Sequence, residues 1–101
     1  MNEADAERIV YDRLLGPNSL SAQVRDNTFV DEAEVNELHR AITALTEFYR
    51  DRPNVPKSIA LAFVDIAARF ENHFYSESQQ ERLQDIGLGL GCLAEELFSD
   101  G

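Results

Sequence analysis

Apolar side chains recur at alternating spacings of three and four residues in the middle of the chain, and this period limits the fold more than any other feature. Val35, Leu38, Ile42, Leu45 and Tyr49 follow it. On an α-helix such residues form one stripe of the kind that helical bundles bury. No segment shows the strict polar–apolar alternation of a half-buried strand. The sequence therefore predicts an all-α fold.

The N-terminal part predicts one clear helix and a connector. The range 3–15 has helical periodicity and ends before Gly16 and Pro17, which together form a helix stop signal. The range 17–30 is rich in Asn and Ser, and Ser19 can cap a short helix within it. We expect a helix followed by a connector that contains a weak helix.

A long helix is expected over residues 31–51. Asp31 and Glu34 have the spacing of a capping box, in which two side chains satisfy free backbone amides at a helix start. Pro53 disfavours helical geometry in the residue before it, so the helix should stop near residue 51.

The range 56–75 is the most apolar of the predicted helices. One broad face contains Ile59, Ala62, Phe63, Ile66, Ala67, Phe70 and Phe74, and a second face contains Leu61, Val64, Ala68 and Tyr75. On the narrow polar side, Asp65 and Arg69 have the spacing of a favourable ion pair. A helix that is apolar on nearly all sides is central to its fold or buried by a partner. We therefore expect its second face to be covered by the first helix and the connector, or by another subunit.

The last predicted helix covers residues 76–98. Ser76 and Gln79 form a capping box at its start. Gly87 and Gly91 lie one turn apart beside its apolar stripe, although each glycine costs about 1 kcal/mol relative to alanine inside a helix. Close approach of a neighbouring backbone explains the pair, and a break in the helix is the alternative.

Together these elements predict a single helical domain over residues 1–101, a compact antiparallel bundle of four to five helices with the helix at about 56–75 in the centre. The chain is long enough to bury one core without disulfides or a structural metal, since 44% of its 101 residues are hydrophobic. The expected core residues are Val35, Leu38, Ile42, Leu45, Ile59, Phe63, Ile66, Phe70, Leu83, Ile86, Leu90 and Leu93.

The formal charge of −10 is unevenly distributed. Residues 1–37 carry nine acids and three bases, and residues 76–101 carry six acids and one base, whereas residues 38–75 are nearly balanced. Nucleic acids and anionic membranes need a basic patch, so direct contact with either is disfavoured. A basic protein partner is favoured, and the alternative is that the acidity serves solubility alone.

Cellular location is predicted from the cysteine content and the apolar runs. One cysteine, Cys92, cannot form an internal disulfide, and the acidic start of the chain lacks the basic residues of a secretory signal. No apolar run approaches the roughly 18 to 20 residues needed to cross a bilayer. We expect a cytoplasmic protein.

No residue pattern indicates catalysis, a cofactor or a metal. The glycine run at 87–91 lacks the preceding strand and nearby base of a phosphate-binding loop. Neither His39 nor His73 has a Glu three residues before it, as a helical di-iron site requires. Cys92 lies among acids, which disfavour a reactive thiolate. Glu71 projects toward apolar positions, so we expect it to form a structural ion pair with an arginine, and the alternative is that it marks a binding surface. We expect no enzyme.

The candidate contact surface combines acids with one apolar side chain. Leu88 and Cys92 lie one turn apart on the side of the last helix opposite its core stripe. An apolar spot rimmed by acids suits a basic partner with an apolar centre, although isolated exposed leucines are common. The candidate partner-binding residues are Asp31, Glu34, Glu37, Glu81, Asp85, Leu88, Glu95 and Glu96.

In size, acidity and expected helical architecture the chain is similar to the general class of bacteriocin immunity proteins and phage-encoded inhibitors, a similarity of composition alone. It implies a bacterial or phage inhibitor that neutralises a basic partner, such as a nuclease toxin or another nucleic-acid-binding protein. The first alternative is a homo-oligomeric adaptor or chaperone, with a homodimer as its simplest form. A more remote one is a helical regulator or enzyme that binds a small ligand.

Overall fold

The computed structural model describes residues 1–99. Within this range it contains five α-helices, one short 3-10 helix and no strand, which confirms the predicted all-α bundle. The helices are α1 (Glu3–Leu14), α2 (Leu20–Arg25), α3 (Glu32–Tyr49), α4 (Lys57–Ala62) and α5 (Glu77–Leu97), and the 3-10 helix is η1 (Ala68–Phe70).

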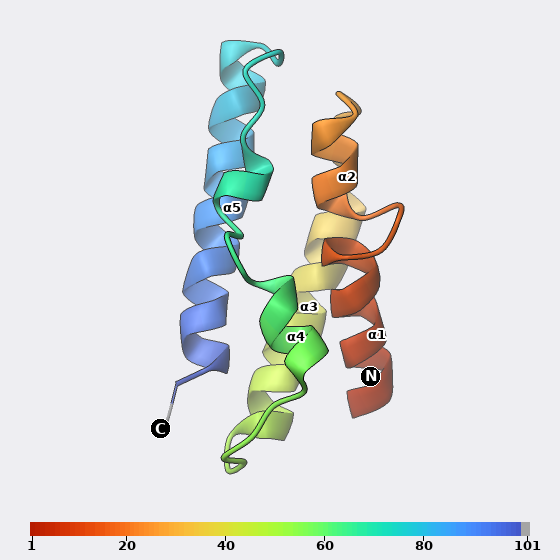
Figure 1. Cartoon of the computed structure of the whole chain (residues 1–101), viewed down its shortest axis with the longest axis vertical. Coiled ribbons are helices and arrows are strands. Elements are labelled where there is room, and N and C mark those ends of the chain that lie inside the picture. Colours follow the sequence, from red (N-terminus) through yellow and green to blue (C-terminus); the bar gives the residue numbers. More distant parts are fainter. Residues whose placement is uncertain (100–101) are drawn as a thin grey trace.

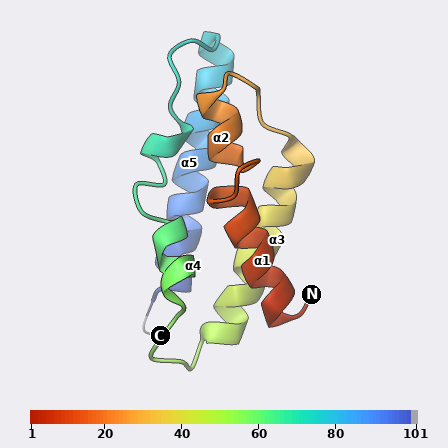
Figure 2. The same ribbon diagram turned by 45° about the vertical axis from the view of Figure 1, so that its right-hand side comes forward.

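The central element is α3, which packs mainly against α1 and α5 (Figure 1). The helix α1 runs antiparallel to α3, as predicted, but α5 runs parallel to it. The chain leaves the end of α3 and returns along the molecule through α4 and η1 before α5 begins (Figure 2). The expected antiparallel order therefore holds for only part of the bundle, and the expectation that residues 56–75 form its centre was wrong.

Two of the predicted helix starts are confirmed by their caps. Ser19 is buried, and its hydroxyl accepts a hydrogen bond from the amide of Ala22, which begins α2 within the connector. Ser76 and Gln79 form the predicted capping box of α5. These side chains satisfy amide groups that a helix start leaves free, so the local sequence alone fixes both boundaries.

The start of α3 differs from the prediction in one respect. Asp31 caps the helix by accepting a hydrogen bond from the amide of Ala33, but Glu34 does not complete a capping box. Its carboxylate instead accepts hydrogen bonds from Arg13 of α1 and Gln23 of α2. A tertiary contact has replaced the expected local one.

The predicted helix over residues 56–75 is broken after α4. Asp65 has a φ of 54°, a left-handed conformation that no α-helix accommodates. Arg69 does not pair with Asp65. Its guanidinium turns back and donates hydrogen bonds to the carbonyls of Leu61, Ala62 and Leu14, at 3.1, 2.9 and 3.4 Å. The Arg69 side chain thus caps the end of α4 and joins it to α1. The prediction of an ion pair between Asp65 and Arg69 was therefore wrong.

This break leaves several apolar side chains of residues 56–75 at the surface, although the sequence predicted that they would be covered. The side chains of Leu61 and Val64 are 57% and 52% exposed, Ala68 is exposed, and Phe74 is 89% exposed. Of the predicted second face, only Tyr75 is partly covered by the connector, where its ring packs edge-on against Phe29. Coverage of that face by α1 and the connector is therefore contradicted, and coverage by another subunit stays a prediction.

The predicted core is otherwise confirmed. Eleven of the twelve expected residues are buried, and Leu93 is half-buried against them. The buried side chains of α1 and α2 complete this single cluster. Within the described residues no helix is long and apolar enough to cross a membrane.

The glycines of α5 do not interrupt it, and the helix continues through residues 87–91. Gly87 is buried against the segment before η1, where a Cβ atom would lie 3.3 Å from the Cα of Ala67. Close backbone approach is thus confirmed at Gly87. The same prediction was wrong for Gly91, since a Cβ atom there would have no neighbour within 4 Å.

Candidate protein-binding surface

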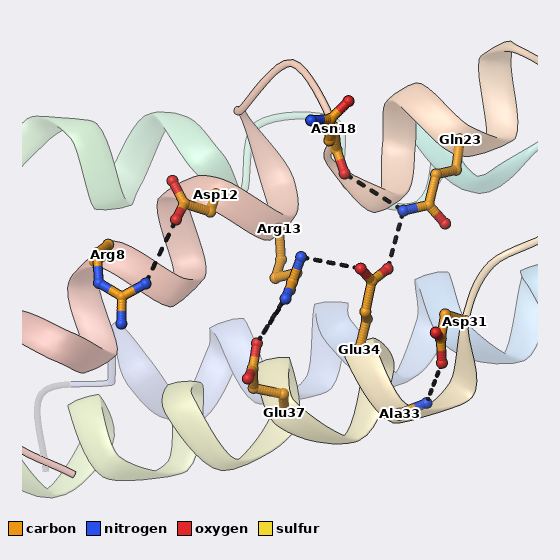
Figure 3. A network of polar contacts seen from close by, with 9 residues as sticks. All are labelled: Arg8, Asp12, Arg13, Asn18, Gln23, Asp31, Ala33, Glu34 and Glu37. Carbon is orange, nitrogen blue, oxygen red and sulfur yellow. Dashed lines mark hydrogen bonds and ion pairs between the residues drawn. The ribbon is translucent and has the colours of Figure 1, made fainter.

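Two of the predicted contact acids already form ion pairs within the molecule. The guanidinium of Arg13 on α1 binds Glu34 and Glu37 on α3, with N–O distances of 3.1 and 3.0 Å (Figure 3). Glu34 also accepts a hydrogen bond of 2.9 Å from the side-chain amide of Gln23 on α2. All three charged side chains are largely covered. Their charges are compensated internally, so they hold α1, α2 and α3 together.

The start of α3 is also tied to α5. Arg82 donates from Nε and Nη2 to the two carboxylate oxygens of Glu32, with an Nε–O distance of 3.0 Å. These hydrogen bonds hold the pKa of Glu32 below its usual value. Asp31 is exposed beside this ion pair but serves as the cap of α3. The predicted contact residues on α3 thus have structural roles.

The predicted contact residues on α5 lie together on its solvent side. They share spacings of three, four and seven residues, which place them on neighbouring rows of the helix. Leu88 is 65% exposed, and Cys92 one turn later is also exposed. We call the following residues the outer face of α5: Glu81, Asp85, Leu88, Cys92, Glu95 and Glu96, all of them exposed.

Several bases near this outer face are bound to acids outside it. Within the described residues, none of its four acids forms an ion pair. Arg82 is the one base of α5, and it is bound to Glu32. At the C-terminal end of α3, Arg50 pairs with Glu47 and lines the same hollow as Glu96, and Arg52 pairs with Glu3. Within residues 1–99 the outer face therefore carries four acids without a salt-bridge partner around an apolar side chain, with Arg82 near Asp85 and Arg50 near Glu96.

An apolar groove between α4 and the end of α5 adjoins the outer face. Its lining residues are Ala60, Phe63, Val64, Ala94, Glu95 and Phe98, and it is an open, shallow hollow of about 440 Å³. Glu95 belongs to both surfaces, so the groove opens directly onto the acidic row. This groove was not expected from the sequence, because Val64 was assigned to a covered second face of a continuous helix.

A second hollow, of about 790 Å³, lies at the other end, between the turn after α1, α2 and η1. Two of its polar side chains, Asn72 and Arg69, are engaged in the fold. Asn72 donates to the carbonyl of Val24 and to the side chain of Asn27, at 2.6 and 2.7 Å. Arg69 donates to three backbone carbonyls. These groups join loops to one another, so they are not free to hold a ligand.

Glu71 differs from its predicted role, and the two histidines lie in different surroundings. Glu71 is exposed and forms no ion pair within residues 1–99, so the expected structural pair is absent. His73 is exposed. His39 is the enclosed histidine: its Nε2 atom is buried without a hydrogen-bond partner in the described chain. Burial, and then the charge of Arg82, lower its pKa.

The described residues contain no group of three or more His, Cys, Asp or Glu side chains that could hold a metal ion. No protein-family model, curated protein or solved structure matches the chain with significance. A proposal of function must therefore rest on the geometry of the outer face and the groove.

Proposed function

We propose that this protein binds a basic protein partner through the outer face of α5 and thereby inhibits it. The observation that carries the proposal is the separation of charge: acids surround the exposed Leu88, while the base of the same helix is bound to Glu32. Such a surface attracts a positively charged patch, and its apolar centre adds contact area once water is expelled.

The proposed mechanism is competition for the partner's basic residues. A nucleic-acid-binding protein uses Lys and Arg side chains to bind phosphates. Carboxylates on a stoichiometric inhibitor occupy the same side chains, and complementary fields speed the encounter. A nuclease toxin is the partner class that fits best, and the inhibitor would act in the bacterial cytoplasm. This refines the predicted contact set to its α5 members, because Glu34 and Glu37 are bound by Arg13.

Self-association is the second candidate function, and the exposed side chains of Leu61 and Val64 favour it. A homodimer would cover this apolar surface, as the predicted adaptor or chaperone requires. It would also bring together two chains that each carry a formal charge of −10, which opposes association at low salt. Sedimentation equilibrium separates the two proposals, since the inhibitor is expected to be monomeric at all concentrations.

Quantitative affinity capture tests the proposed function. The wild-type protein, attached through a terminal tag, is incubated with lysate of its source organism, and retained proteins are identified by mass spectrometry. A double substitution, Asp85→Lys with Glu96→Lys, reverses two charges on the outer face. A control double substitution, Asp51→Lys with Glu71→Lys, makes the same change of net charge at exposed acids elsewhere.

The expected result is a basic protein that is retained by the wild type and by the control but lost from the α5 variant. Circular dichroism should show the same helical content in all three proteins, because the substituted side chains are exposed. Equal retention by both variants would show that overall charge, and not this face, governs binding. Retention of acidic proteins alone would contradict the proposal.

A further inference from the structure

We infer that the groove between α4 and α5 receives an amphipathic helix of the basic partner. The apolar side of that helix would fill the groove, and its Lys and Arg residues would face Glu95 and the outer face of α5. The inference rests on the proposed function and specifies it, since it names the structural form in which the partner presents its charge. Binding of an amphipathic helix in an apolar groove is a common mode of peptide recognition.

The shape of the groove suits a helix. Ala60 of α4 and the two residues after this helix, Phe63 and Val64, contribute one part of the lining, and Ala94 and Glu95 of α5 with its C-cap residue Phe98 contribute the other. Two of the wall residues are alanines, so an incoming helix can approach both backbones closely. Of the six lining residues only Glu95 is charged. The groove therefore offers apolar contact along its length and a carboxylate at its edge.

The walls of the groove are held in place without a partner. The rings of Phe63 and Phe98 pack edge to face, with centroids 5.7 Å apart and planes at 82°, and so join α4 to the end of α5. Arg69 fixes the end of α4 by its hydrogen bonds to the carbonyls of Leu61 and Ala62. A site that is already ordered loses little entropy on binding, which favours affinity.

Charge decides between a basic helix and a second copy of this chain. In a two-fold dimer the same patch meets itself, so the two Glu95 side chains would approach one another across the groove. The acids of both outer faces would add to that repulsion. A helix with Lys and Arg beside its apolar stripe instead gains at every one of these positions. The groove and the outer face are thus complementary to one kind of occupant.

Synthetic peptides provide the probe. An amphipathic peptide of about 14 residues, with Leu and Lys at helical spacing, would extend roughly 20 Å as a helix, which is long enough to cover the groove. A scrambled peptide of the same composition carries equal charge without an apolar stripe, and a third peptide has Glu in place of Lys. Affinities are measured by fluorescence anisotropy with the full-length protein. Backbone amide shifts on titration locate the bound peptide.

Three variants test the groove separately from the charge. Val64→Ser removes a half-exposed apolar wall residue, and Ala60→Gln partly fills the groove. Tyr11→Ser is the matched control, because Tyr11 is an exposed apolar residue of α1 outside the groove, at 48%. The amphipathic peptide should bind the wild type about tenfold more tightly than the scrambled peptide does, and both groove variants should abolish most of that difference. The control should retain it.

The outcomes separate the two proposals. If the peptides bind equally and only charge reversal on α5 weakens them, the groove inference is wrong while the proposed function stands. If the acidic peptide binds as tightly as the basic ones, both fail. Amide shifts confined to residues outside 60–64 and 91–98 would also overturn the inference. So would a wild-type dimer that Val64→Ser converts to a monomer, since the occupant would then be a second copy.

Discussion

Gly87 on α5 lies directly against Ala67, in the segment that returns from α4. A Cβ atom on Gly87 would come within 3.3 Å of both the Cα and the carbonyl oxygen of Ala67. This contact lets the returning chain lie close to α5, and it explains why a helix of this length tolerates a glycine at its buried side. Gly89 and Gly91 have no such neighbour.

Substitution of these glycines by alanine should therefore change the free energy of unfolding by different amounts. Gly89→Ala should raise the free energy of unfolding by about 0.5 to 1 kcal/mol, because alanine has the higher helix propensity and the site is open. Gly87→Ala should gain less than this or lose stability, since the backbone of Ala67 must shift. Urea denaturation measures both values. An equal gain at the two positions would contradict the close contact.

The left-handed conformation of Asp65 predicts an unusual pair of results. Asp65→Gly should preserve or raise stability, because glycine adopts a positive φ without strain, whereas Asp65→Ala should lower it by about 1 kcal/mol. A continuous helix over residues 56–75 would give the opposite order, since alanine favours a helix and glycine weakens it. Thermal unfolding of the two variants therefore tests the break after α4 directly.

Arg13 should contribute more to stability than an exposed arginine on the same helix. Arg13→Gln leaves Glu34 and Glu37 partly covered without their cation, so we expect a loss of about 1 to 2 kcal/mol. Arg8→Gln removes an exposed pair with Asp12 and should cost less than about 0.5 kcal/mol. Chemical denaturation of both variants provides the comparison. Equal losses would show that the Arg13 network does not join the helices.

His39 should make stability depend on pH below neutrality. Its pKa is lowered in the folded protein, so the unfolded chain takes up a proton first as the pH falls. The contribution of neutral His39 to the free energy of unfolding is therefore fully present above the ordinary histidine pKa of about 6.5. It declines as the pH falls from there toward the lowered pKa of the folded protein. Denaturation at pH 7 and pH 5.5 should show this decline. His39→Leu should reduce it, while His73→Gln, at an exposed site, should leave it unchanged.

The sequence was informative wherever local chemistry determines structure. The caps at Ser19 and Ser76 and the stripe from Val35 to Tyr49 set three helices and most of the core. The prediction of one continuous helix over residues 56–75 was wrong, because tertiary hydrogen bonds override the helical period of this segment. Nothing in the order of residues shows that Arg69 will bind the carbonyls at the end of α4 rather than Asp65.

The candidate site was predictable to a similar extent. The outer face of α5 follows from helical spacing, so Glu81, Asp85 and Leu88 were found correctly as exposed neighbours. The groove was not predictable, because it depends on where α4 ends and how it packs against α5. The pairing of Glu34 with Arg13 is likewise a contact between helices, and periodicity within one helix does not reveal it.

The central claim is that the outer face of α5 recognises a basic protein, and its most direct measurement is the association rate of the captured partner at several salt concentrations. For the wild type, the rate should fall steeply as ionic strength rises, because screening weakens the attraction. Asp85→Lys with Glu96→Lys should slow association about tenfold at low salt and flatten that dependence, with the Asp51→Lys, Glu71→Lys control much closer to wild type. An association rate that is indifferent to salt and equal in all three proteins would contradict the account.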